Sequence, residues 1–241
     1  MIPKVKDDVL ALCKKADSNL WGSFNRAIDM ARQTAISHQV FPTYSEKSGG
    51  AIRMSEQEAC FAFVEAIIAS NYLFSAETPT KKLYQFSGKS EESARTDLSL
   101  YNTTLENVLG IEFKSKGVSL STSSHPKITK DIQKLLREPC DGLWFHVLKS
   151  TYNNTITNLF KVFQSDMLDM YKKYKGDIGD KVIIFHICVL KHGFSVHKMC
   201  EVNESSITVP NLKQFFQLEY HVSREELVNT NNKNCWNVNI K

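Results

Sequence analysis

Between residues 55 and 149, helical and strand patterns alternate in the order helix, three strands, helix, strand. The first helix follows a Ser-x-x-Glu start signal at 55–58, and two prolines, Pro126 and Pro139, bound the second helix. Turn-rich segments separate three short runs of β-forming residues, which predicts an antiparallel meander. The predicted helices cover 59–71 and 126–137, and the predicted strands cover 82–86, 94–101, 108–114 and 143–148. This order predicts an α/β fold with a mixed central sheet.

The segments on either side of this core add further helices and strands. Residues 1–40 carry two packing helices, and residues 150–241 extend the same sheet. The predicted elements are helices after Pro3, from about Leu20, from Asn153 or Asn154 and at 223–226, strands at 182–190 and ending near Met199, and a loose turn or terminal strand at 229–234. No linker-like segment divides the chain, so we expect one domain over 1–241.

The composition sets broad limits on the protein. A chain of 241 residues with 42% hydrophobic side chains can bury a sizeable core in one domain. The first residues are charged where a secretory signal would be apolar, and no run reaches membrane-spanning length. We therefore expect a soluble, cytoplasmic protein whose six cysteines, which form no C-x-x-C pair, are reduced. The net charge of +4 permits a nucleic-acid partner without requiring one.

Acidic side chains stand on two neighbouring strands of the predicted meander. Asp97 lies in the second strand, and Glu112 and Lys114 lie in the third. Residues two apart in a strand project from the same face, so Glu112 and Lys114 share a face while Phe113 points to the other side. If the two strands pair as a hairpin, Asp97 reaches the same face close to Glu112.

Two carboxylates and a lysine in this arrangement suit the hydrolysis of phosphodiester bonds. Asp97 and Glu112 can hold Mg²⁺ through oxygen ligands and leave coordination positions for water and a phosphate oxygen. Lys114 can orient the attacking water, stabilise the transition state, or help to deprotonate water if its pKa is lowered. The alternative explanation of the same three residues is a salt-bridge cluster on an exposed sheet face.

The pattern of Asp97 followed by Glu112-Phe113-Lys114 resembles the PD-(D/E)XK nuclease superfamily, whose members share a restriction endonuclease-like fold. The core of that family runs helix, three strands, helix, strand, which is the order inferred above. The resemblance implies a Mg²⁺- or Mn²⁺-dependent endonuclease in which Asp97, Glu112 and the backbone carbonyl of Phe113 bind the metal. It also implies that Lys114 assists the attacking water. Thr96 stands where the name-giving proline would be, and that proline is often absent in the family.

The first helix of this family frequently contributes a further glutamate to the metal site. Glu58 and Glu65 lie seven residues apart on one face of the predicted helix, and Glu58 is the first candidate for this role. The alternative role of Glu58 is that of the glutamate in a capping box at the helix start. The alternative role of Glu65 is an ordinary ion pair.

Basic side chains that follow the motif are candidate contacts to phosphate groups. The helix at 126–137 carries several of them on the face opposite its apolar stripe. A solvated helix face explains these residues equally well. The candidate nucleic-acid contacts are Lys116, Lys127, Lys130 and Lys134, with Arg137 on the same helix face.

The sequence therefore predicts a metal-dependent nuclease that acts on nucleic acid, with DNA favoured over RNA, in a restriction-like or defence-associated role. A homodimer is expected from the resemblance alone, because many such nucleases dimerise to cut two strands. The alternative from another class is a non-catalytic nucleic-acid- or protein-binding module that retains the nuclease fold. If the motif is accidental, Asp97 will lie far from Glu112 in the structure.

Overall fold

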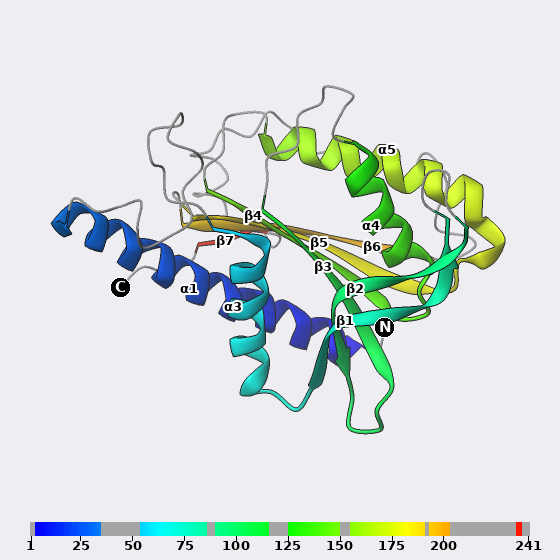
Figure 1. Cartoon of the computed structure of the whole chain (residues 1–241), viewed down its shortest axis with the longest axis horizontal. Coiled ribbons are helices and arrows are strands. Elements are labelled where there is room, and N and C mark those ends of the chain that lie inside the picture. The colour runs from blue at the N-terminus through cyan, green and yellow to red at the C-terminus, as the bar shows by residue number, and fades with distance from the viewer. Residues whose placement is uncertain are drawn as a thin grey trace.

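The computed structural model describes residues 3–34, 54–85, 90–115, 125–149, 155–190, 193–202 and 235–237 (Figure 1). Its helices are α1 (Pro3–Thr34), α3 (Glu56–Ile68), α4 (His125–Arg137) and α5 (Thr155–Tyr174), with a short 3₁₀ turn η2 (Lys175–Asp177). Its strands are β1 (Leu73–Tyr84), β2 (Glu92–Tyr101), β3 (Asn107–Lys114), β4 (Asp141–Leu148), β5 (Lys181–Val189), β6 (Phe194–Val202) and β7 (Cys235–Asn237).

The strands form one mixed sheet in the order β1-β2-β3-β4-β5-β6-β7. The first three strands pair antiparallel, β3, β4 and β5 run parallel, and β6 and β7 are again antiparallel to their neighbours. Parallel neighbours need crossover connections, and α4 and α5 supply them between β3, β4 and β5. Because β3 and β4 are parallel, their carboxyl ends meet at one edge of the sheet, where Lys114 lies opposite His146.

Helices cover both faces of the sheet, so the molecule has three layers (Figure 1). One core lies under α1 and α3, and a second lies under α4 and α5. Strand β5 runs between the two cores and all of its residues are buried, which explains its nearly continuous apolar sequence. The largest buried side chains of the first core are Phe24, Phe63, Phe113 and Phe145, and those of the second are Trp144, Phe160, Phe163, Phe185 and Phe194.

The predicted α/β class, the mixed sheet and the order helix, three strands, helix, strand are confirmed as α3-β1-β2-β3-α4-β4. The predicted N-terminal helical region is present, but the two helices expected after Pro3 and from about Leu20 form one continuous helix, α1, of 32 residues. Next to the expected start at Leu20, the Ser18 hydroxyl donates to the Lys14 carbonyl at 3.1 Å, within the helix. The Asn19 amide donates to the Ala62 carbonyl of α3 at 3.3 Å, so neither residue interrupts α1.

Strand β1 begins nine residues earlier than predicted. It lies at the edge of the sheet, where most of its side chains are exposed, and so lacks the alternation that marks a half-buried strand. Its pairing with β2 shifts register between Pro79 and Leu83. The predicted elements at 223–226 and 229–234 lie outside the described residues.

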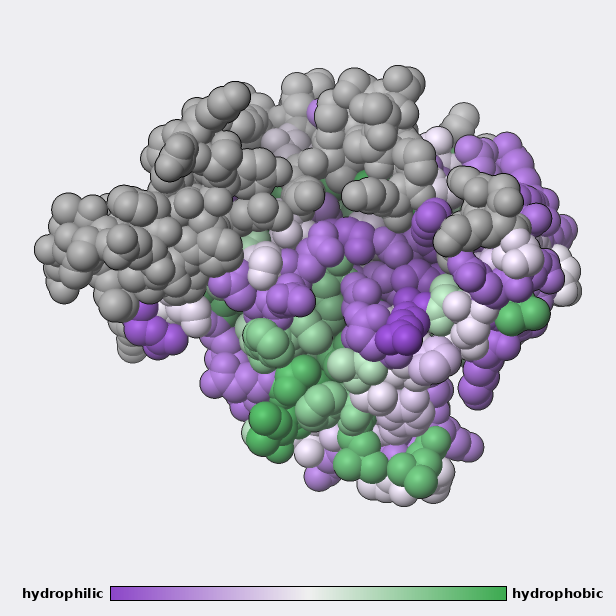
Figure 2. Space-filling model, viewed as in Figure 1, coloured by the Kyte–Doolittle hydropathy of each residue, from purple (hydrophilic) through white to green (hydrophobic). Residues whose placement is uncertain are grey.

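Exposed apolar side chains gather on one side of the molecule, over α3 and the lower end of the β-meander (Figure 2). They include Phe61 and Ile68 of α3, Leu73 and Phe74 of β1, and Leu105 in the turn before β3. Such a surface offers no charge for binding phosphate. Among the described helices, none is long and apolar enough to cross a membrane.

Candidate active site

The three motif residues come together at the carboxyl end of β3. The backbone pairing between β2 and β3 includes Leu98 opposite Ile111. One residue before Leu98 in β2, the Asp97 side chain contacts β3 directly, because its Oδ2 accepts a hydrogen bond from the Phe113 amide at 2.8 Å. Asp97 therefore lies beside the Glu112-Phe113-Lys114 segment, which is the proximity that the hairpin prediction required.

Glu112 is the most deeply buried member of the site. Its side chain is 0% exposed, and its Oε2 accepts a hydrogen bond from Lys134 of α4 at 2.7 Å. Its other oxygen, Oε1, is buried and has no hydrogen-bond partner within the part of the chain that the structure describes. Burial, followed by the negative charge of Asp131, raises the pKa of Glu112 well above its usual value. The carboxylate thus has one oxygen held and one oxygen unsatisfied.

Helix α4 contributes two charged side chains to the same site. The Lys134 ammonium also donates to the Arg95 carbonyl at 2.8 Å and lies 3.0 Å from Asp131 Oδ1. The other oxygen of Asp131, Oδ2, lies 2.9 Å from the Lys114 Nζ. We call these five charged residues the Glu112 cluster: Asp97, Glu112, Lys114, Asp131 and Lys134.

The charges of the Glu112 cluster shift one another's pKa values. Burial alone would lower the pKa of Lys134, but Glu112 and Asp131 outweigh it and raise that pKa to about 12. Burial alone would raise the pKa of Asp131, but Lys134 and Lys114 outweigh it and lower that pKa. Asp131 and both lysines are therefore charged at neutral pH.

Lys114 lies at the open side of the Glu112 cluster. Its side chain is 20% exposed, whereas that of Lys134 is 9% exposed. Its Nζ donates to the Phe113 carbonyl at 2.9 Å and lies 5.8 Å from the centre of the Trp144 ring. Burial opposes its charge, but Asp131 and then Asp97 raise its pKa above the usual value. A lysine held protonated cannot accept a proton from water, so this environment favours the orienting and charge-stabilising roles over that of a base.

The oxygen atoms at this position suit a hard divalent cation. The unpartnered Glu112 Oε1, the Asp97 carboxylate and the Phe113 carbonyl are the donor types that Mg²⁺ prefers, and Mg²⁺ retains several waters when few protein oxygens bind it. Across the described residues, no group of three His, Cys, Asp or Glu side chains is placed to hold a metal. The protein ligands would therefore be two carboxylates and one carbonyl.

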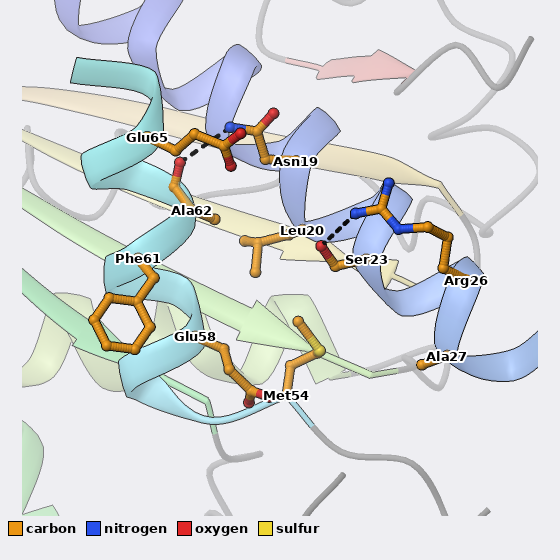
Figure 3. Close-up of a pocket in the computed structure, with 10 residues that line it drawn as sticks. All are labelled: Asn19, Leu20, Ser23, Arg26, Ala27, Met54, Glu58, Phe61, Ala62 and Glu65. Carbon is orange, nitrogen blue, oxygen red and sulfur yellow. Dashed lines mark hydrogen bonds between the residues drawn. The ribbon is translucent and has the colours of Figure 1, made fainter. Parts of the chain in front are cut away.

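Glu58 and Glu65 lie away from the Glu112 cluster. Ser55 Oγ accepts from the Glu58 amide at 3.2 Å, and the Glu58 carboxylate accepts from the Ser55 amide, so the capping box is complete. Both glutamates line a pocket of about 370 Å³ between α1 and α3 (Figure 3). The acid of α3 whose charge acts on Lys114 is Glu56. Residues two apart on a helix point about 200° apart, which explains why Glu56 and Glu58 face different surroundings.

The predicted basic face of α4 is divided between solvent and protein. Lys130 is exposed, as the helix pattern predicted. The Lys134 side chain is only 9% exposed, because it reaches the carboxylates of Glu112 and Asp131. The guanidinium of Arg137 pairs with Asp177 at 2.7 Å and lies between the rings of Tyr84 and Tyr174, 4.8 and 4.6 Å from their centres. Lys116 and the side chain of Lys127 lie outside the described residues.

Asp131 was not among the residues expected in the site. The sequence does carry a signal for it, because a helix that connects two parallel strands packs against the face of the sheet that those strands form. Asp131 and Lys134 lie three residues apart on that helix and so share a face. Combining the crossover with this spacing would have placed both residues over Glu112.

Comparisons with models of protein families, with characterised proteins and with solved structures find no match to this chain. The fold itself defines an α/β protein with a mixed sheet and helices on both faces. A function must therefore be argued from the Glu112 cluster.

Proposed function

We propose that this protein is a metal-dependent nuclease that hydrolyses phosphodiester bonds of nucleic acid. The observation that carries the proposal is the carboxylate of Glu112, which is fully buried and has one unsatisfied oxygen. Glu112 directly precedes Phe113, whose amide donates to Asp97 and whose carbonyl accepts from Lys114. Unsatisfied buried carboxylate oxygens are rare because they are unfavourable, and a bound cation would remove the penalty.

In this proposal Asp97, Glu112 and the Phe113 carbonyl would hold Mg²⁺ or Mn²⁺. When bound, the metal would supply positive charge for a phosphate oxygen and would acidify a coordinated water. Asp97 is prepared for this role because its contact with the Phe113 amide fixes one oxygen at 2.8 Å and orients the carboxylate toward β3. The Phe113 carbonyl has two lone pairs, so its bond from Lys114 leaves one lone pair for a further contact.

Lys114 is the cation that a substrate would reach. It is more exposed than Lys134, and its neighbours keep it protonated. Its ammonium can donate to a phosphate oxygen or to the attacking water, and so stabilise the negative charge that develops in the transition state. Asp131 acts through Lys114 by holding its Nζ at 2.9 Å.

The element order supports a PD-(D/E)XK-type core. In this chain α3-β1-β2-β3-α4-β4 follows the order that the resemblance implies, with the motif on β2 and β3. The exposed Lys130, together with Lys116 and Lys127, would then contact phosphates of the nucleic acid, with DNA favoured over RNA and a homodimer for cutting two strands.

A second candidate function is a non-catalytic binding module that retains the fold. It is favoured by the neutralisation of both lysines, because Lys114 and Lys134 each pair with Asp131. A site in which every cation already has a carboxylate partner can be purely structural.

Cleavage assays separate the two candidates. Single- and double-stranded DNA and RNA are incubated with Mg²⁺ or Mn²⁺ and the wild type, Asp97→Ala, Lys114→Ala, or the control Lys161→Met, which changes an exposed lysine of α5. We expect metal-dependent cutting by the wild type and the control, and a loss of about a hundredfold or more in both site variants. Nucleic-acid binding without cutting by the wild type would instead support the binding module, and cutting that both site variants retain would contradict the site.

A further inference from the structure

All three hydrogen-bond donors of the Lys134 ammonium contact protein acceptors. An ammonium has three donors, and those of Lys134 contact Glu112 Oε2 at 2.7 Å, the Arg95 carbonyl at 2.8 Å and Asp131 Oδ1 at 3.0 Å. With a side chain that is 9% exposed, it has little access to solvent or to a substrate. A lysine in this position does not fit a role in binding phosphate, so its charge must act inside the site.

Lys134 contacts one carboxylate oxygen of Glu112 and not the other. Lys134 holds Oε2, whereas Oε1 has no partner among the described residues. A cation at Oε1 would therefore lie on the same carboxylate as the Lys134 ammonium, separated from it by only a few ångströms. At that separation two positive charges in a partly buried site repel each other strongly.

Resting on the proposed function, we infer that Lys134 is a built-in counter-cation of the metal site. It compensates the buried charge of Glu112, so that the protein folds without metal, and by the same charge it weakens metal binding. Lys134 is thus a positioning residue, and its two effects have opposite signs. Loss of its charge destabilises the metal-free protein and tightens the binding of a divalent cation.

This pair of effects distinguishes a counter-cation from a lysine that only supports packing. Loss of a packing residue lowers stability and disturbs the site, so metal binding weakens or stays the same. Loss of a counter-cation leaves Glu112 and Asp131 with less positive charge nearby. A divalent metal ion then supplies the missing positive charge, so metal binding tightens. Stability and metal affinity consequently change in opposite directions only in the second case.

The test measures the Mn²⁺ affinity of the full chain by titration calorimetry, and its melting temperature with and without Mn²⁺. The proteins are the wild type, Lys134→Met, Lys134→Arg, the exposed-lysine control Lys161→Met and the site variant Asp97→Ala. For Lys134→Met we expect a melting temperature lower by roughly 10 °C without metal. We also expect a Kd for Mn²⁺ at least about tenfold lower than that of the wild type, and a larger stabilisation by Mn²⁺. Lys134→Arg retains the charge and should keep a Kd close to that of the wild type, as should Lys161→Met.

If Lys134→Met fails to fold without metal, Lys134→Gln provides the second variant, because its amide still donates to Glu112 Oε2 without carrying charge. The same direction of both changes is expected, with smaller shifts. Folding of Lys134→Met only in the presence of Mn²⁺ would support the inference as well.

Failure of this inference and failure of the proposed function give different results. If the wild type binds Mn²⁺ and Asp97→Ala does not, but Lys134→Met and Lys134→Gln bind it no more tightly than the wild type, the counter-cation role is overturned and the metal site stands. If the wild type does not bind Mn²⁺, or Asp97→Ala binds it equally well, the metal site and the inference built on it both fall.

Discussion

Two buried carboxylates lie against opposite faces of the sheet, and they differ in whether both of their oxygens have a partner and in their access to solvent. On the α1 side, Asp17 lies against His186 of β5, with both carboxylate oxygens 2.9 and 3.0 Å from the ring Nε2 and both side chains 0% exposed. On the α4 side, Glu112 is equally buried but keeps one unsatisfied oxygen, and its cluster reaches solvent through Lys114.

This difference indicates what each group can do. The Asp17–His186 pair joins α1 to the middle of the sheet and offers no approach to a ligand, so its contribution is to the packing of α1. The Glu112 cluster has an acceptor without a partner among the described residues, Glu112 Oε1, and a partly exposed cation, Lys114. Both could contact a bound substrate. Burial of charge alone therefore does not mark a site, whereas a buried carboxylate that keeps an unsatisfied oxygen close to a partly exposed cation does.

Substitutions of Glu112 and Asp17 should have opposite consequences, with loss of activity for the first and loss of stability for the second. Glu112→Gln keeps the shape and the bond to Lys134 but removes a metal-binding charge, so we expect metal-dependent cleavage to fall about a thousandfold or more. Asp17→Ala leaves His186 without its carboxylate, so we expect the free energy of unfolding to fall by about 3 kcal/mol. Cleavage assays and urea unfolding of both variants measure the two effects.

Each variant is the control for the other. The folded fraction of Asp17→Ala should cleave at the rate of the wild type, and Glu112→Gln should keep most of its stability. Loss of cleavage in folded Asp17→Ala, or full cleavage by Glu112→Gln, would show that the two groups do not differ in the way proposed.

The α1 side of the sheet should also be more sensitive to acid, because His197 pairs with His186 across β5 and β6. Burial, and then the charge of His186, lowers the pKa of His197 to about 4 from its ordinary 6.5. Between these pH values the unfolded state binds a proton that the folded state does not. Stability is therefore unaffected by His197 above pH 6.5 and falls as the pH decreases toward 4.

We expect this residue to remove up to about 2 kcal/mol of stability between pH 6.5 and 4. Urea unfolding of the wild type and His197→Gln at several pH values measures the difference, which should shrink as the pH falls, because the variant lacks the proton uptake. A difference that is constant over this range would contradict the lowered pKa.

The sequence predicted the core elements well where local patterns decide them. The capping box at Ser55 started α3 close to the expected residue, and Pro126 stood at the start of α4. The failures came where tertiary contacts decide. The second helix expected from about Leu20 continues α1, whose Asn19 amide donates to the Ala62 carbonyl of α3, 43 positions away. Strand β1 lacked alternation because it is an edge strand whose side chains are mostly exposed.

For the site, strand periodicity was enough to bring Asp97, Glu112 and Lys114 together. The same reasoning could not give the role of Lys134. The helix pattern placed this residue on the solvent face, but its ammonium turns inward and pairs with the carboxylates of Glu112 and Asp131. A charge placed opposite an apolar stripe is normally solvated, and only the packing of α4 on β3 reveals that its target is Glu112.

The smallest expected effect concerns Glu58, which the sequence alone could assign either to the metal site or to the helix cap. Glutamine also completes a capping box, so Glu58→Gln should change the free energy of unfolding by less than about 0.5 kcal/mol. If the residue only caps α3, cleavage and Mn²⁺ affinity should equal those of the wild type, whereas Glu58→Ala should lose about 1 kcal/mol of stability.

A loss of cleavage in Glu58→Gln at unchanged stability would return Glu58 to the site, and would mean that α3 moves toward Asp97 when substrate or metal binds. Glu56→Gln is the matched comparison, because Glu56 is the α3 acid whose charge already acts on Lys114.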